Sequence, residues 1–341
     1  MMMRRTTIAL GGQPAATTAL GPPPPAATPD FNDQASRQAP APWSEAERGS
    51  RELNNSAGRQ QASQEVKNSA GRQQVVYRAG SGPPLVWLHS LYGVEADAPL
   101  IEALAEHYAV FAPLAPGFAD LDELDDIRDI HDLALHYDDV MEALELPEAV
   151  VAGHSFGAML AAELAAHFPS RVSRLVLLSP LGLWNDRYPV ADLFGLPALE
   201  VPKLLYADPS RAPSSGDGKP DVDKVIALTR GMTTVARFLW PIPDRGLARR
   251  LRRVRAPTLI VHGDQDRFVP VQYVDDFLRL LPNATCKIIP GVGHMLLTEA
   301  LDEVIDVILR RDDEGSASRT RPESTDPSQA QDDMASKEAR A

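Results

Sequence analysis

The segment Gly153-His154-Ser155-Phe156-Gly157 constrains the fold more than any other feature of this chain. It follows the apolar run at 149–152 and precedes the helical run at 158–164, so the pattern predicts a strand, a tight turn and a helix with Ser155 at the apex. The two glycines fit such a turn, because a side chain at either position would collide with the neighbouring strand and helix. The turn also places Ser155 at a helix N-terminus, where free backbone N–H groups stabilise negative charge. A bare G-x-S-x-G arises by chance, but the strand and helix around this one indicate a nucleophilic serine.

A serine hydroxyl is a weak nucleophile near neutral pH, so it needs a general base, and the base needs an acid partner that fixes its tautomer. Both candidates follow predicted strands further along the chain. His294 comes after the apolar run at 285–290, and we expect it to be the base. The run at 256–262 leads into a turn that contains Asp264 and Asp266, and either carboxylate is a candidate acid. We interpret the other histidines as structural; they are His89, His107, His131, His136, His154, His167 and His262.

The order Ser155, Asp266, His294 along the chain resembles that of the α/β-hydrolase superfamily. The resemblance covers about residues 75 to 311 and implies one α/β domain, with a mainly parallel, twisted sheet and helices on both of its faces. By resemblance to the family's Gly-x-x-Asp turn, Asp266 is the acid and Asp264 caps the loop. The resemblance therefore implies a catalytic triad of Ser155, Asp266 and His294, with no metal and no cofactor.

The intermediate of acyl transfer carries an oxyanion, which preorganised N–H donors stabilise by roughly 3 kcal/mol each. One expected donor is the backbone N–H of Phe156, the residue after the serine. By resemblance, the second is the N–H of Leu91, in the loop after the run at 85–89. Family members usually have His-Gly at this point, whereas this chain has His89-Ser90. Glycine adopts backbone angles that serine reaches only with strain, and we interpret the Ser90 hydroxyl as satisfying a local turn.

Strand-like and helical runs alternate along the chain, which is typical of a parallel sheet covered by helices. The predicted strands are 85–89, 108–114, 149–154, 174–179, 257–262 and 285–289, and the predicted helices are 96–107, 131–145, 156–168, 271–281 and 297–311. The interval 181–253 is too long for one crossover, so we expect a helical lid inserted after the sixth strand, where the family commonly carries its cap. Trp184, Met232 and Trp240 are candidate substrate-binding residues in this lid, although large apolar residues are as often a lid's own core.

The lid divides the expected hydrolase core into a first part at 63–180 and a second part at 254–311, with the lid itself at 181–253. Residues 1–62 and 312–341 contain few large apolar side chains. Burial of these segments cannot offset the entropy of ordering them, so we expect two disordered tails.

A tandem duplication lies where the domain begins. The segment at 50–61 is echoed at 63–74, and the second copy runs directly into the apolar residues 75–78. The second copy is therefore expected to form an edge hairpin whose turn lies at 68–71. Only one copy fits that edge, so the first is predicted to be a loose repeat within the N-terminal tail.

Composition narrows the classes of partner. The net charge of −13 argues against nucleic acid, because phosphate binding requires a basic surface. Cys286 is the only cysteine, which excludes a disulfide framework and a cysteine-based metal site. Arg4-Arg5 and the apolar residues after them resemble an export signal, but Gly11-Gly12 interrupts the stretch. No run approaches the roughly 20 apolar residues of a membrane span, so we expect a soluble, cytoplasmic protein with a small hydrophobic molecule as its partner.

These residues together predict a serine hydrolase that cleaves an ester-like carbonyl through an acyl-enzyme intermediate. A serine at this turn weighs against dehalogenase and epoxide hydrolase chemistry, which uses aspartate in this superfamily. The resemblance leaves two enzymatic alternatives on the same triad, namely a carbon–carbon bond hydrolase and a cofactor-free peroxidase. A small-molecule receptor on the hydrolase fold also remains open, because fold alone does not settle function.

Overall fold

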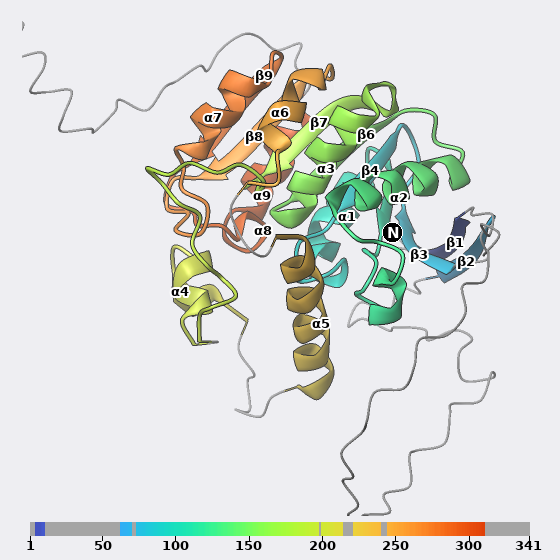
Figure 1. Ribbon diagram of the computed structural model, residues 1–341, viewed down its shortest axis with the longest axis horizontal. Coiled ribbons are helices and arrows are strands. Elements are labelled where there is room, and N and C mark those ends of the chain that lie inside the picture. Colours follow the sequence, from blue (N-terminus) through green and yellow to red (C-terminus); the bar gives the residue numbers. More distant parts are fainter. Residues whose placement is uncertain are drawn as a thin grey trace, which may run out of the picture.

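The computed structural model describes residues 4–10, 62–69, 73–197, 199–213, 221–239 and 244–310. Within these ranges nine strands form one sheet, in the order β1-β2-β3-β5-β4-β6-β7-β8-β9 (Figure 1). Their bounds are β1 Arg4–Leu10, β2 Ala62–Ser69, β3 Gln73–Ala79, β4 Pro84–Leu88, β5 Ala109–Pro113, β6 Ala149–His154, β7 Val172–Leu178, β8 Thr258–Gly263 and β9 Ala284–Ile289. Neighbouring strands from β5 to β9 are parallel, and β3 is antiparallel to β5. The mainly parallel sheet expected from the sequence is confirmed.

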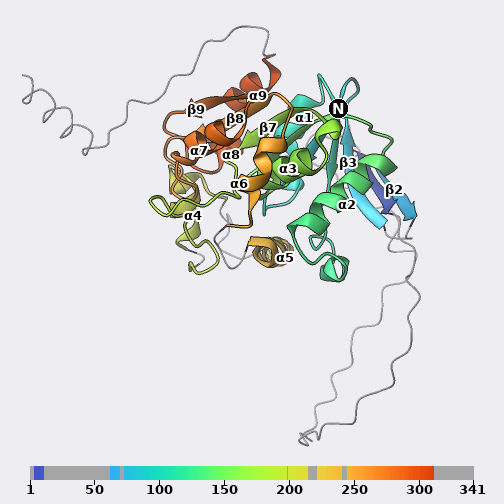
Figure 2. The same ribbon diagram turned by 45° about the horizontal axis from the view of Figure 1, so that its top comes forward.

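The central strands are buried on both faces, which explains why their sequences are nearly continuous apolar runs. Successive residues of β7 alternate between two cores: Leu175 and Leu177 join one apolar cluster, whereas Val176 and Leu178 join the other. Helices α2 (Ile130–Ala143), α3 (Phe156–His167) and α7 (Tyr273–Leu280) cover the first face, and α1 (Ala98–Leu104) and α9 (Leu301–Leu309) cover the second (Figures 1 and 2). Among the helices of the described ranges, none has the length and apolar character that crossing a lipid bilayer requires.

The predicted helix 297–311 is divided in the structure. It consists of α8 (Leu296–Glu299) and α9, and Ala300 between them leaves the helical region with φ −147° and ψ 43°. Leu296 of α8 and Val304 and Ile308 of α9 are all buried in the second core. Both parts of the divided helix therefore contribute apolar side chains to the same core.

The N-terminal edge of the sheet departs from the expected disordered tail. Residues 4–10 form β1, which pairs parallel with β2 and antiparallel with β3, so the expectation is wrong for these seven residues. The β-branched residues Thr6, Thr7 and Ile8 favour an extended backbone, which explains the strand. β2 and β3 are antiparallel where Val66 and Lys67 pair with Gln74 and Gln73, as the hairpin in the second repeat predicts, and β1 pairs with both strands. The first repeat copy at 50–61 and the tail at 312–341 lie outside the described residues.

Between β7 and β8 the described residues include the helices α4 (Val201–Leu205), α5 (Val222–Leu239) and α6 (Leu247–Arg250). α4 and α5 lie on the same side of the molecule in both views (Figures 1 and 2). α6 instead packs against α3, the helix that begins directly after Ser155.

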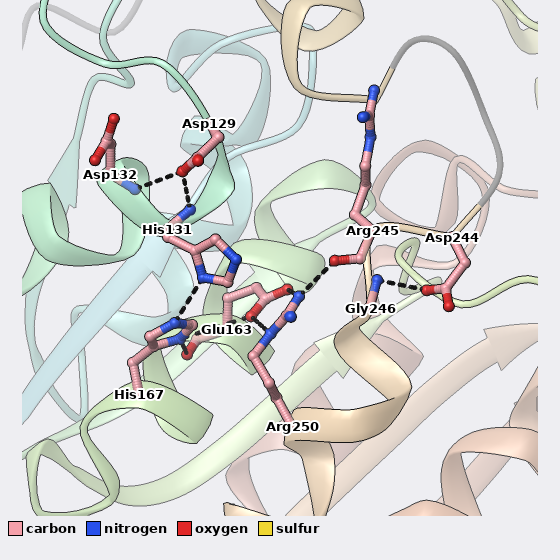
Figure 3. Close-up of polar contacts among 9 residues, drawn as sticks. All are labelled: Asp129, His131, Asp132, Glu163, His167, Asp244, Arg245, Gly246 and Arg250. Atoms are coloured by element: carbon pink, nitrogen blue, oxygen red, sulfur yellow. Dashed lines mark hydrogen bonds and ion pairs between the residues drawn. The ribbon is translucent and has the colours of Figure 1, made fainter.

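A buried ion pair joins α6 to α3. Glu163 lies in the middle of α3, and its two carboxylate oxygens accept hydrogen bonds of 2.7 and 2.6 Å from Nε and Nη2 of Arg250 (Figure 3). The Glu163 side chain is 1% exposed and that of Arg250 is 20% exposed, so the arginine shields the carboxylate from solvent. His167 Nδ1 also donates to the Glu163 carbonyl oxygen at 2.8 Å, and its Nε2 lies 2.9 Å from Nδ1 of His131 on α2. Glu163 is thus the point at which α2, α3 and α6 are connected.

Replacing Arg250 with alanine is expected to destabilise the domain by about 3 kcal/mol, because it leaves the Glu163 carboxylate buried without its counter-charge. Chemical denaturation followed by circular dichroism measures the loss. Arg252→Ala, which removes an exposed arginine two residues away, serves as the control and should leave the unfolding midpoint near that of the wild type. The double variant Glu163→Gln, Arg250→Ala should recover part of the loss, since no buried charge remains. An Arg250→Ala midpoint equal to the control's would contradict this role.

Candidate active site

Ser155 lies at the apex of the turn between β6 and α3 in a strained backbone conformation, with φ 58° and ψ −115°. The flanking glycines are required by close approach. A Cβ at Gly153 would lie 2.5 Å from the Gly157 carbonyl, and a Cβ at Gly157 would lie 2.0 Å from the Leu88 carbonyl oxygen. The Ser155 N–H donates to the Leu178 carbonyl at 2.8 Å, which fixes the apex to the end of β7. The turn predicted from the sequence is therefore present, and crowding by the β4 backbone explains why residue 157 is glycine.

The structure brings Ser155, Asp266 and His294 together although they are far apart in sequence. His294 Nδ1 lies 2.7 Å from Asp266 Oδ2, and His294 Nε2 lies 2.8 Å from Ser155 Oγ. An ionised carboxylate only accepts hydrogen bonds, so Nδ1 carries the proton and Nε2 is left to accept from the serine hydroxyl. Burial acts to raise the pKa of Asp266, but the charge of His294 and its hydrogen bond outweigh burial and hold that pKa below its ordinary value. This chain of two hydrogen bonds has the geometry that serine activation requires.

Two further hydrogen bonds orient the Asp266 carboxylate. Its Oδ1 accepts from the N–H groups of Phe268 at 2.9 Å and Val269 at 2.8 Å, which leaves Oδ2 for His294. Asp264, the alternative acid, instead accepts from the Gly291 N–H at 2.6 Å. Asp264 therefore connects the two loops rather than contacting the imidazole, in line with the capping interpretation.

His89 fixes the loop that contains Leu91. Its Nε2 accepts from the Ala115 N–H at 2.8 Å, so Nδ1 is the protonated nitrogen and donates to the Ser90 carbonyl at 2.6 Å. Burial lowers the pKa of His89, which keeps the ring neutral in this arrangement. In a trans peptide the N–H points opposite to the carbonyl, so the Leu91 N–H points away from the His89 ring.

The two expected oxyanion donors make no hydrogen bond that the described residues show. Within the described residues, the N–H groups of Leu91 and Phe156 have no acceptor in the protein. Ser90 is not among the described residues with positive φ, so replacing the family's glycine causes no such strain here. The Ser90 hydroxyl accepts from the Tyr92 N–H at 3.4 Å, the local turn that the sequence predicts.

Two more buried histidines, which the sequence indicates only as structural, contact the loops of Asp266 and His294. His154 Nε2 donates to the His294 carbonyl at 2.9 Å. Burial, together with the nearby charge of His294, lowers the pKa of His154 to about 3, so this ring stays neutral. His262 Nε2 lies 2.9 Å from the Val269 carbonyl and 3.4 Å from Asp266 Oδ2, and burial lowers its pKa too. Position at the end of a buried strand is the one sequence signal that could have singled them out.

Helix α5 lies against the Ser155 turn and the Leu91 loop. The Phe238 ring stacks on Phe156 with centroids 6.2 Å apart. A Cβ at Gly231 would lie 2.2 Å from the Leu91 carbonyl oxygen, so the helix meets this loop at backbone distance. Met232 is partly buried against the same core.

The other two candidate substrate-binding residues differ from Met232. Trp184 is partly buried against the core, and its Nε1 donates to Asp186 at 2.7 Å. Trp240 lies outside the described residues. Among the hydrogen bonds and ring contacts of the described residues, none joins Trp184 or Met232 to Ser155, and their role in binding stays a prediction.

Comparison with known proteins identifies the family of the fold. Residues 83–301 match the model of a family described as "alpha/beta hydrolase fold". The chain is 29% identical over 239 residues to a 2-hydroxymuconate semialdehyde hydrolase of Pseudomonas sp. (strain CF600), covering 64% of this chain and 83% of the relative. It is 27% identical over 247 residues to a non-heme haloperoxidase of Rhodococcus erythropolis, covering 66% of this chain and 90% of the relative.

Solved structures of the same fold resemble it as well. A meta-cleavage product hydrolase from Pseudomonas fluorescens superimposes with a TM-score of 0.58 at 22% identity, covering 70% of this chain and 93% of that chain. A bacterial membrane phospholipase A superimposes with a TM-score of 0.60 at 20% identity, covering 69% of this chain and 81% of that chain. The family match spans well over half of the residues, and the chain belongs to the alpha/beta hydrolase fold family.

Proposed function

We propose that the chain is a serine hydrolase that cleaves a small, apolar, ester-like substrate by two-step acyl transfer. His294 Nε2 takes the proton of Ser155, and the serine oxygen attacks the substrate carbonyl. The leaving group departs with that proton, and a water molecule, deprotonated in turn by His294, releases the acyl group. The observation that carries the proposal is the pair of hydrogen bonds from Asp266 through His294 to Ser155, of 2.7 and 2.8 Å.

The oxyanion would be held by the N–H groups of Phe156 and Leu91. Support comes from their unsatisfied state, since a donor that is free before the reaction needs no reorganisation when negative charge develops. The neutral His89 ring fixes the Ser90–Leu91 peptide, which supports a preformed site. Because the ring contacts the carbonyl side of that peptide, the Leu91 N–H is left for the substrate.

A carbon–carbon bond hydrolase on the same three residues is the second candidate. It is favoured by the relative whose name is 2-hydroxymuconate semialdehyde hydrolase. These reactions are distinguished by measuring, side by side, the hydrolysis of short esters, lactones and ring-fission diketones and the formation of peracid. The highest kcat/KM among them identifies the reaction class.

A serine-directed fluorophosphonate tests the proposal directly. The full chain should gain the mass of one adduct, and peptide mapping should locate the adduct on Ser155. A Ser155→Ala variant should gain none. If the wild type stays unlabelled and turns over no substrate in the screen, the chain is a binding protein on a hydrolase fold instead.

We also propose that the helices between β7 and β8 form a lid over the substrate. The contacts of α5 with Phe156 and Leu91 support this, because both residues belong to the reacting end of the site. Met232→Ala should change the ratio of kcat/KM between short and bulky esters by the equivalent of about 1–3 kcal/mol. Val225, which is 50% exposed on the same helix, provides the control, and Val225→Ala should leave the ratio unchanged. A uniform loss on all esters with Met232→Ala would indicate a packing role only.

A further inference from the structure

One carboxylate connects the loop before His294 to the segment after α4. Glu299, the last residue of α8, lies five residues beyond His294, and its side chain turns back toward that loop. Its Oε2 accepts from the Gly293 N–H at 2.8 Å and from the Ala207 N–H at 3.2 Å. Its Oε1 accepts from the Asp208 N–H at 3.1 Å. Three backbone donors from two separate parts of the chain therefore share a single side chain.

The contact with Gly293 acts on the residue that precedes the proposed base. Gly293 is buried, and its N–H would lack this acceptor without Glu299. On the other side of the loop, His154 holds the His294 carbonyl. The backbone around His294 is thus fixed from both directions, by a carboxylate before it and an imidazole after it.

The contacts with Ala207 and Asp208 act on the proposed lid. The two loops meet at backbone distance, because a Cβ at Gly293 would lie 2.5 Å from the Ala207 nitrogen. The Met295 N–H also donates to the Leu205 carbonyl at 3.1 Å. Arg211 donates separately to the Glu299 and Thr298 carbonyls, both at 2.9 Å, and so attaches the same segment to α8 without touching Gly293.

We infer that Glu299 is a positioning residue. Its carboxylate fixes the His294 loop relative to residues 207–208 of the proposed lid. The inference rests on the proposed function and extends it, since a side chain outside the triad, that of Glu299, would then determine the position of the general base His294. A displacement of about 1 Å in a reacting group can cost 10²-fold in rate, so a loop held by one carboxylate is sensitive to its removal. Glutamine keeps one acceptor oxygen where glutamate has two, and alanine keeps none.

Kinetics of Glu299→Gln and Glu299→Ala on a short ester test this inference. Glu299→Gln should lower kcat about 10-fold, and Glu299→Ala should lower it further. KM should change less than about threefold in both variants, because the geometry of the reacting groups is affected rather than substrate binding. The fluorophosphonate labelling rate should fall in parallel with kcat. Thermal unfolding of each variant shows whether the fold is kept, and if alanine prevents folding, the glutamine variant carries the test.

Arg211→Ala is the matched control, because it loosens the same segment from α8 but leaves the Gly293 contact intact. It should leave kcat on the short ester near the wild-type value. An equal fall in kcat for Arg211→Ala and Glu299→Gln would show that attachment of the lid alone matters and would overturn the inference. Wild-type kcat in a folded Glu299→Ala variant would overturn it too. Failure of the proposed function is distinguishable, since the wild type itself would then remain unlabelled.

Discussion

Ser155→Ala is expected to lower kcat by about 10³- to 10⁶-fold on the best ester while leaving the domain folded. The hydroxyl is the proposed nucleophile, and without it only substrate binding and the oxyanion donors remain to promote direct attack by water. Alanine retains the strain of the turn rather than adding to it, because Ser155 already lies at φ 58°. Steady-state kinetics at saturating substrate, together with an unfolding curve, measure both parts of the expectation.

Ser179 offers a matched control. It lies at the end of β7, is buried, and also has a positive φ, of 41°, but its hydroxyl has no hydrogen-bond partner among the described residues. Ser179→Ala should therefore keep kcat near the wild-type value. Should Ser155→Ala turn over substrate at a rate close to that of Ser179→Ala, another nucleophile must be sought.

The Ser155 turn was predictable because its determinants are local. An apolar run, two glycines and a helical run lie next to one another in the sequence, and each glycine meets the backbone crowding that such a turn produces. Asp266 and His294 were predictable for a related reason, because parallel strands end at the same edge of the sheet and so bring their following loops together. The order of the strands then determined which loops those were.

The contacts around these residues were not predictable in the same way. Glu299 meets Ala207 across 92 positions of sequence, in a segment whose path depends on the whole insertion. His154 meets His294 across 140 positions, and nothing in its neighbours distinguishes a histidine that holds a carbonyl from one that only fills space. β1 escaped prediction because its pairing partners lie more than 50 residues away, beyond a stretch of low apolar content.

Two buried imidazoles, those of His294 and His262, lie 2.7 and 3.4 Å from Asp266 Oδ2, and a third, that of His154, donates to the His294 carbonyl. His154 and His262 both have lowered pKa values, chiefly through burial, so they remain neutral near pH 7. A positive charge on either ring would compete with His294 for the single carboxylate. Neutral rings instead donate to the carbonyls of His294 and Val269. In the proposed mechanism, the negative charge of Asp266 is thus left to stabilise the imidazolium that would form on His294 during proton transfer.

Asp266→Asn should lower kcat by about 10⁴-fold with little change in stability, and Asp264→Asn should not. The Asp266 Oδ1 position receives two N–H donors, from Phe268 and Val269, so an asparagine must keep its carbonyl oxygen there and present its NH₂ to His294. Nδ1 of His294 would then have to accept, which moves the ring proton to Nε2 and leaves no base facing Ser155.

Asp264 is the control, because asparagine there keeps an oxygen that can accept from the Gly291 N–H. The measurement is kcat for both variants at a pH on the plateau of the wild-type pH–rate profile, with unfolding midpoints compared to verify the fold. Equal losses would mean that connecting the two loops matters as much as orienting the imidazole. A larger loss for Asp264→Asn would transfer the role of acid to Asp264. The expected difference follows from one contrast: the Asp266 carboxylate meets an imidazole nitrogen whose protonation decides the reaction, whereas the Asp264 carboxylate meets a backbone N–H that does not titrate.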